Sequence, residues 1–297
     1  MKIGNLLVNA AYLGERVLAA IAVGTTKVWE GVSKYIKFAD PVVESLCMKW
    51  SSDGVGLTPE DAANVTDIGT TFQGNKEIKN FEEFKYFTGV HYIVSAFQNT
   101  TLESISIPTS LKDIRGKTFS GSNNLLSVHV ESLEHHLNIY FRDALCNPCN
   151  TNSHAQLYVS GEAIKEVVIP ESISTINSWA FEGCYWLEKI TIPQHVLTIK
   201  ASAITNCVNL KYPIVFNRDY DTIYGFTFYG CISVPYYDFR VATKVPKLEH
   251  INAFYRIPDF CSIVIPDSLY EQWTAATNWS AYADKIVKAS EFVEPNE

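Results

Sequence analysis

The sequence has little charge and no uninterrupted apolar run of any length. Only 19% of its 297 residues are charged, and the formal net charge is −8. No basic stripe is present that could neutralise a phosphate backbone, so we expect no nucleic-acid partner. No stretch approaches the roughly 18 apolar residues of a membrane span, so we also expect no membrane insertion.

The N-terminal residues lack the pattern of a secretory signal. Such a signal needs a basic start, an unbroken apolar run and a small-residue cleavage site. Here the apolar residues are interrupted by Asn5, Asn9, Glu15 and Arg16. We therefore expect neither an export signal nor a membrane anchor in this segment.

Motifs of the common catalytic sites are missing as well. The sequence contains no P-loop, no GxGxxG, no GxSxG and no HExxH. The acidic residues Glu103, Glu166, Glu171, Glu182 and Glu188 lie at variable positions of a repeat, as solvated side chains do. The sequence therefore predicts no catalytic residue, no metal site and no cofactor.

A repeat is present instead. Phe181, in the segment AFEGC, recurs every 22 to 26 residues at Phe72, Phe97, Phe119, Ile204, Phe228 and Phe254. The exception is the step of 62 residues before Phe181, which we interpret as one turn plus about 40 inserted residues. Cysteines follow three residues later at Cys184, Cys207 and Cys231. One such turn cannot bury its apolar side chains alone, so the pattern predicts a solenoid of stacked coils.

The pattern Ile-x-Ile-Pro-x-Ser-[Leu/Ile]-x-x-Ile-x-x-x-[Ala/Thr]-Phe-x-Gly-Cys-x-x-Leu resembles the BspA-type leucine-rich repeat from about Val65 to Asp267. This family is common in surface proteins of gut Bacteroidetes and in tail or fibre proteins of their phages. The resemblance implies an α+β fold, with a repeat solenoid over residues 65–267 and a variant turn at 131–165. It also implies a ligand-binding or structural scaffold rather than a catalyst.

The two ends of the chain have patterns of their own. In residues 1–36, Gly4, Gly14 and Gly24 punctuate strand-like runs, which predicts a small β meander. A similar segment begins many phage structural proteins, which implies a virion-anchoring region; an ordinary β cap on the first repeat is the alternative. Residues 267–289 have helical periodicity with Asp267 or Ser268 as N-cap, so we predict a helical cap and tail over residues 268–297.

Residues 37–64 are predicted to form a degenerate dockerin-like helix pair. One helix is expected over Pro41–Trp50, and a second begins after Thr58, with Pro59 at its first position. The loop between them resembles a calcium loop but has Val55 where a fifth ligand would be needed. We therefore interpret the loop as decayed, and calcium binding stays open.

The variant turn holds the one cluster of residues suited to metal or redox chemistry. We expect its runs LNIYF and AQLYVS to form paired strands, with Gly161 in the reverse turn. Cys146 and Cys149 lie between these runs, with His135, His136 and His154 nearby. A second half of a zinc site is missing, and no βαβ context supports a thioredoxin-like motif. We therefore interpret Cys146 and Cys149 as loop cysteines rather than as zinc ligands or redox groups. The cysteines of the repeats are interpreted as buried free thiols, which indicates assembly in a reducing compartment.

Aromatic residues occupy repeat positions that are usually small or polar in the family. Exposed in rows along a solenoid, they offer large contact area at low entropic cost. The alternative is that several pack between turns or cover a chain end. We predict as binding residues Trp179, Tyr185, Trp186, Tyr229, Tyr236, Tyr237 and Tyr255.

Three functions remain compatible with these patterns. The first is a non-enzymatic phage virion protein that contacts other virion proteins through residues 1–36 and a host-surface glycan or protein through its repeats. The second is a bacterial cell-surface adhesin, which predicts an export signal, and the third is an intracellular interaction scaffold. Homo-oligomerisation is left open, because no heptad or collagen-like repeat imposes a symmetry.

Overall fold

The structure, a computed structural model, describes residues 33–150 and 152–295, together with the backbone of four short strands near the N-terminus. These strands form two antiparallel pairs, β1 (Lys2–Ile3) with β2 (Leu6–Leu7) and β3 (Ala20–Val23) with β4 (Thr26–Glu30). They fall in the segment for which a β meander is predicted. The rest of residues 1–32 lies outside the described part, and the anchoring role stays a prediction.

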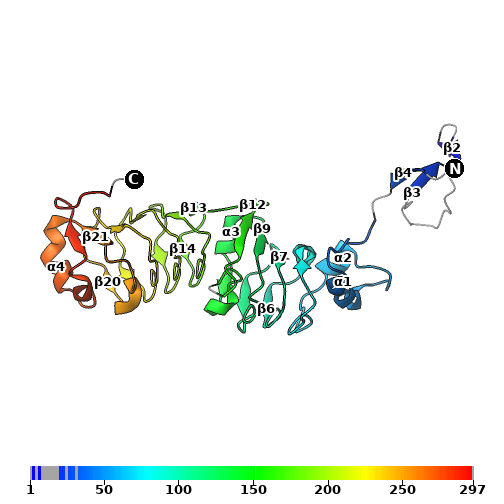
Figure 1. The fold of residues 1–297 in the computed structure, drawn as a ribbon, viewed down its shortest axis with the longest axis horizontal. Helices are drawn as coiled ribbons and strands as arrows, with labels where there is room; N and C mark the ends of the chain where they lie inside the picture. The colour runs from blue at the N-terminus through cyan, green and yellow to red at the C-terminus, as the bar shows by residue number, and fades with distance from the viewer. Residues whose placement is uncertain are drawn as a thin grey trace.

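The repeats wind into an elongated solenoid (Figure 1). Most coils contribute one strand to each of two ladders, and the strands of a ladder are parallel except at one hairpin. On one side the strands are β5 (Asn80–Phe81), β7 (Ser104–Ser106), β9 (Ser127–Val130), β11 (Gln156–Val159), β12 (Glu162–Ala163), β13 (Glu166–Val168), β15 (Lys189–Thr191), β17 (Ile214–Val215), β19 (Tyr236–Asp238) and β21 (Ser262–Ile265). On the other they are β6 (Tyr92–Val94), β8 (Asp113–Arg115), β10 (Tyr140–Phe141), β14 (Thr175–Ile176), β16 (Thr198–Ile199), β18 (Thr222–Ile223) and β20 (Lys247–Leu248).

The repeated phenylalanines stack on one another inside the solenoid. Ring centroids of Phe72 and Phe97 are 5.6 Å apart, those of Phe97 and Phe119 are 5.7 Å apart, and those of Phe228 and Phe254 are 5.4 Å apart. All five side chains are buried. Stacked aromatic rings at this separation are favourable beyond the area they bury. The predicted repeat register is therefore confirmed.

The glycine of the repeat has a backbone reason. Two residues after each stacked side chain the backbone enters the left-handed region, where a side chain is strained and glycine is not. The residues at this position are Gly74, Asn99, Gly121, Gly183, Asn206, Gly230 and Arg256. A Cβ on Gly121 would lie 2.1 Å from Asn99 Oδ1, and one on Gly230 would lie 2.4 Å from Asn206 Oδ1. An asparagine in one coil thus requires a glycine in the next.

The predicted helix pair is present, and it covers the first coil. It comprises α1 (Pro41–Cys47), the 3₁₀ turn η1 (Met48–Trp50) and α2 (Pro59–Ala63), which has a Thr58–Asp61 capping box. Asp40 Oδ2 accepts hydrogen bonds from the backbone N–H groups of Lys79 (2.6 Å) and Asn80 (3.1 Å) in the first coil. The coil itself continues through η2 (Glu82–Tyr86).

The other end is closed by short helical turns and a strand. The elements are η4 (Ile251–Phe254), η5 (Asp267–Leu269), α4 (Tyr270–Ala275), η6 (Trp279–Tyr282) and β22 (Ile286–Lys288). Trp273 and Trp279 are fully buried and cover the last rings of the core. The predicted N-cap is wrong, because α4 begins at Tyr270 and Asp267 instead accepts from Ser290 N (3.1 Å). Ile286 lies in a strand rather than a helix because β22 extends the sheet beyond β21.

The variant region contains one complete extra coil. The predicted pairing of LNIYF with AQLYVS is wrong, because β10 pairs with β8 and β11 pairs with β9. The coil also contains α3 (Leu133–Leu137) and η3 (Ala144–Cys146). Phe119 N donates to Leu145 O (2.9 Å), just as Phe181 N donates to Ala203 O (2.9 Å), so Cys146 occupies the stacked position held by Ile204 in the later coil. The step of 62 residues is therefore a whole coil followed by a hairpin.

That hairpin divides the solenoid. The chain turns through Gly161 (φ 86°) so that β12 pairs antiparallel with β11. Of the strands in the described residues, β13 pairs with β15 alone. On the other side β10 has β8 as a neighbour and no second strand among those that the structure describes. We call this break, between the coil of residues 131–159 and the coil that begins at Glu166, the seam.

Candidate functional site

The structure divides the seven predicted binding residues into two groups. Trp186, Tyr236 and Tyr237 are buried, so their predicted exposure is wrong. Trp186 packs against Phe181, and Tyr237 packs between the rings of Phe228 and Phe254. The alternative that several aromatic residues pack between turns or cover a chain end therefore holds for these three, since Tyr236 lies against Phe292 of the tail. The four that reach the surface are Trp179, Tyr185, Tyr229 and Tyr255.

Two of the surface residues belong to a cluster that we call the aromatic row. It consists of Phe226, Tyr229, His250 and Tyr255, on successive coils near the C-terminal end. The Tyr229 and Tyr255 rings stack with centroids 5.7 Å apart, and the Phe226 ring stacks on His250 at 5.2 Å. Tyr255 is 53% exposed and Phe226 is 38% exposed. The row therefore presents stacked, partly exposed rings at the surface.

The sequence contained a signal for Phe226 that the repeat template did not use. It lies two residues before the stacked Phe228, the same position that Trp179 holds before Phe181. Both residues have a left-handed backbone, with φ of 60° and 59°. Side chains at this position leave the core, so an aromatic residue there is a surface aromatic.

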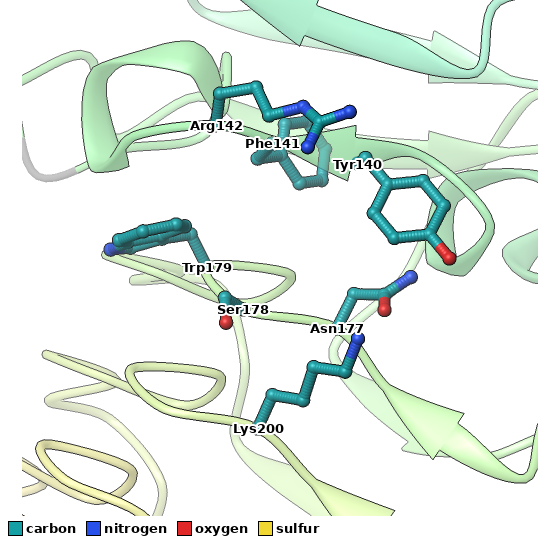
Figure 2. A pocket seen from close by; sticks show the side chains of 7 residues that line it. All are labelled: Tyr140, Phe141, Arg142, Asn177, Ser178, Trp179 and Lys200. Atoms are coloured by element: carbon teal, nitrogen blue, oxygen red, sulfur yellow. The ribbon is translucent and has the colours of Figure 1, made fainter.

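The second surface feature is a pocket of about 280 Å³ at the seam. Figure 2 shows side chains from both sides of the break around it. One side contributes β10 and the residue after it, and the other contributes the following two coils. The lining residues are Tyr140, Phe141, Arg142, Asn177, Ser178, Trp179 and Lys200. Of these, only Trp179 is among the binding residues predicted from the sequence.

An ion-pair network fixes one wall of the seam pocket. Arg142 donates through Nε to Asp113 Oδ1 (2.8 Å) and through Nη2 to Asp113 Oδ2 (2.7 Å). Arg115 donates to the same carboxylate from Nε (2.9 Å) and Nη2 (2.6 Å). Hydrogen bonds from the two guanidinium groups lower the pKa of Asp113 to about 2 despite its burial, and the hydrogen bonds from Arg142 have the larger effect. A planar guanidinium held in this bidentate way has a defined orientation.

Side-chain amides and a histidine bridge the seam where strands do not. Asn177 Nδ2 donates to Leu137 O (3.2 Å), and Asn147 Nδ2 donates to Trp179 O (2.8 Å). His136 Nε2 lies 2.9 Å from Ala180 O, so this nitrogen carries the proton. The two blocks of coils are therefore joined by specific contacts without a continuous backbone ladder.

The cysteine cluster of the variant turn has a structural explanation. Cys146 lies in the column of stacked side chains, and Cys149 occupies the position that Cys184, Cys207 and Cys231 hold in later coils. Cys207 Sγ donates to Phe181 O (2.9 Å) and Cys231 Sγ to Ile204 O (3.0 Å). All seven cysteines are free and buried, as predicted for the repeats. Over residues 33–150 and 152–295 no group of three or more His, Cys, Asp or Glu residues could hold a metal ion.

The burial of these thiols predicts low reactivity. Burial raises the pKa of Cys149 and of Cys261 to about 12, and it raises the pKa values of Cys184 and Cys207 well above their ordinary value. At pH 8 a thiol with a pKa near 12 is a thiolate only about one part in ten thousand of the time. We expect Ellman's reagent to react slowly with the native chain and rapidly with all seven thiols in guanidinium. Rapid stoichiometric reaction of the native chain would contradict the buried column.

Three of the five acidic residues singled out in the sequence lie beside lysine side chains. Glu103 pairs with Lys79 (2.7 Å), Glu188 pairs with Lys211 (2.6 Å), and Glu166 lies 3.9 Å from Lys189. Glu182 is buried, which corrects its predicted solvation. In the loop of residues 51–57, Asp53 Oδ1 accepts from Val55 N (2.9 Å), so a candidate calcium ligand is engaged within the loop.

Comparison with known proteins identifies the repeats. The chain matches the family described as the BspA type leucine rich repeat region, in six copies, over residues 62–153 and 151–276. Leucine-rich repeats are in general non-catalytic protein-interaction modules. A search of curated proteins gives no match. No described helix is long and apolar enough to span a bilayer.

Three solved structures have a similar arrangement. A leucine-rich repeat protein from Eubacterium ventriosum is 20% identical, with 67% of this chain and 51% of that chain covered and a TM-score of 0.39. A leucine rich cell surface protein from Faecalibacterium prausnitzii is 19% identical, with coverages of 68% and 61% and a TM-score of 0.40. A leucine-rich repeat protein from Bacteroides ovatus is 16% identical, with coverages of 76% and 82% and a TM-score of 0.31.

The matched part of this chain thus spans 51% and 61% of the lengths of the first two of these structures. The family match itself extends over more than half of the chain and contains every coil of the two ladders from β5 to β21. This chain therefore belongs to the BspA type leucine-rich repeat family.

Proposed function

We propose that the chain is a non-catalytic recognition protein whose coils bind a glycan or protein on another surface. The observation that supports this function is the aromatic row, because its Phe226 and Tyr255 side chains are exposed while the neighbouring rings of the core are buried. Exposed tyrosines held in place by stacking lose little conformational freedom on binding. They are therefore suited to anchor a ligand.

We propose that the chain is part of a phage particle. Residues 1–36 would attach it to the particle by binding other virion proteins. A bacterial envelope, as for an adhesin, is the alternative carrier, and both would present the coils to a host surface. Immunogold labelling of particles and of cells from the native source distinguishes them. Gold on particles supports the virion role, gold on envelopes alone replaces it by the adhesin role, and gold confined to the cell interior indicates the scaffold.

The recognition role predicts the effect of removing two rings of the aromatic row. A chain with Tyr229→Ser and Tyr255→Ser should fold normally and bind intact host cells about tenfold more weakly or worse. An anchoring aromatic residue typically contributes more than the roughly 1.4 kcal/mol that corresponds to a factor of ten. Binding is measured with the fluorescently labelled chain on the cell surface. Tyr185 and Trp186 together would be a poor test, because Trp186 is buried.

A matched control removes two other exposed tyrosines. Tyr86 is 39% exposed and Tyr212 is 38% exposed, and neither belongs to the aromatic row. The variant with Tyr86→Ser and Tyr212→Ser should retain full binding. Equal binding by the wild-type chain and the Tyr229/Tyr255 variant would remove the aromatic row from the proposed function.

A further inference from the structure

We propose that the seam pocket binds a single carboxylate-bearing sugar residue of a glycan. This inference rests on the proposed recognition role and adds to the aromatic row a separate subsite with its own chemistry. Arg142 and Lys200 would contact the carboxylate, and Trp179 and Tyr140 would flank the sugar ring (Figure 2). None of these four residues takes part in the aromatic row.

The pocket exists because the seam interrupts both ladders. Where the second ladder continues, the next strand covers the outer edge of its neighbour, as β16 does for β14. At the seam β10 has no such neighbour, and the space beside it is lined by side chains of residues 177–179 and by Lys200. The same loop is held in place by the Asn177 and Asn147 hydrogen bonds, so the pocket is preformed.

The charge of the lining favours an anion, although the chain as a whole is acidic. Arg115, Arg142 and Asp113 together carry one net positive charge, and Lys200 adds a second. Among the described residues Lys200 has no carboxylate partner, and its Nζ lies 5.7 Å from the centroid of the Tyr140 ring. Asp143 directly follows Arg142 in the chain. Its carboxylate accepts a hydrogen bond from Leu145 N (2.9 Å) at the start of η3. Arg142 uses Nε and Nη2 for Asp113, which leaves Nη1 for a ligand.

The remaining lining residues favour a sugar over an acidic peptide. Tyr140 is 48% exposed and Trp179 is half-buried, so two aromatic faces border the pocket. The C–H groups of a pyranose ring are slightly positive and pack well on the negative face of an aromatic ring. Ser178 adds a hydroxyl group that can exchange hydrogen bonds with sugar hydroxyls. A volume of about 280 Å³ is at the lower limit of ligand pockets, which fits one ring rather than a peptide segment.

The test measures dissociation constants of the full chain by calorimetry. The acidic probes are tetragalacturonate, a hyaluronan tetrasaccharide and 3′-sialyllactose, and the neutral probe is the methyl ester of tetragalacturonate. We expect at least one acidic probe to bind, and a chain with Arg142→Gln and Lys200→Gln to bind it about tenfold more weakly or worse. If tetragalacturonate binds, the wild-type chain should bind its methyl ester with an affinity that is lower by a similar factor. Trp179→Ala should weaken the acid and the ester alike, because the ring stacks on both.

The control variant loses the same two positive charges at positions that do not line the seam pocket. Lys37 and Lys76 are exposed and take part in no ion pair in the described part of the chain. A chain with Lys37→Gln and Lys76→Gln should bind the acidic probe as the wild type does. Equal losses in both variants would show a general charge effect and overturn the site, as would the failure of all three acidic probes to bind.

Two further outcomes separate this inference from the proposed function. Binding of hexaglutamate that is lost on Arg142→Gln with Lys200→Gln, without binding of the sugars, would overturn the sugar assignment in favour of an acidic peptide. The variant with Tyr229→Ser and Tyr255→Ser should keep its affinity for the acidic probe while losing cell binding. Loss of cell binding in that variant with no acidic-sugar binding in the wild type would leave the recognition role intact and refute the seam subsite alone.

Discussion

Replacement of Phe181 by alanine is expected to lower the free energy of unfolding by about 3–5 kcal/mol. The Phe181 side chain is fully buried, and its ring packs near those of His136 and Trp186, with centroids 6.2 Å and 6.5 Å away. Its removal leaves a cavity beside the seam, where no continuous ladder holds the coils together. Urea denaturation followed by circular dichroism measures the loss.

The matched control is Phe260→Ala. Phe260 is 69% exposed, so its truncation should change the free energy of unfolding by less than about 0.5 kcal/mol. A Phe181→Ala chain as stable as the Phe260→Ala chain would mean that the repeat register, and with it the column of stacked rings, is wrong.

Acidification from pH 7.5 to 4.5 is expected to lower the free energy of unfolding by about 2–3 kcal/mol through His136 alone. Burial lowers the pKa of His136 from an ordinary value of 6.5 to about 4. Between these two values the unfolded chain takes up a proton that the folded chain does not, so stability falls as the pH falls. Above pH 6.5 both states are neutral at this residue, and the effect vanishes.

His136→Gln tests the assignment, because glutamine can donate to Ala180 O but does not titrate. Its stability should depend less on pH over the same range. Burial also lowers the pKa values of His129 and His135, so a smaller slope of the same sign should remain. Identical pH dependence of the wild-type and His136→Gln chains would show that His136 is not buried as a neutral side chain.

The repeat could be predicted from sequence because its signals are local. The stacked phenylalanine, the left-handed residue that follows it and the capped helix after Thr58 each depend on residues within one coil or one turn. Stacking then repeats the same environment in every coil. The positions of Phe97, Phe119 and Phe228 in the core therefore followed from their spacing alone.

The seam and its pocket could not be predicted in the same way. Cys146 replaces a phenylalanine in the stacked column, so the coil that contains it did not match the template. β10 pairs with β8, and β11 pairs with both β9 and β12, so each of these pairings except the hairpin joins residues of different coils. The burial of Tyr236 was also missed, because its ring is covered by Phe292 of the tail.

The parallel ladders also set a fixed interval along the molecule. Each coil advances by the distance between hydrogen-bonded strands, about 4.8 Å, and the Tyr229 and Tyr255 rings repeat at a comparable 5.7 Å. A ligand that is itself a polymer can therefore occupy neighbouring coils with successive units. After the first unit has bound, the second binds at a high effective concentration, so weak contacts of single units sum to strong attachment. Such multivalent binding depends on polymer length, a property that a single deep pocket does not have.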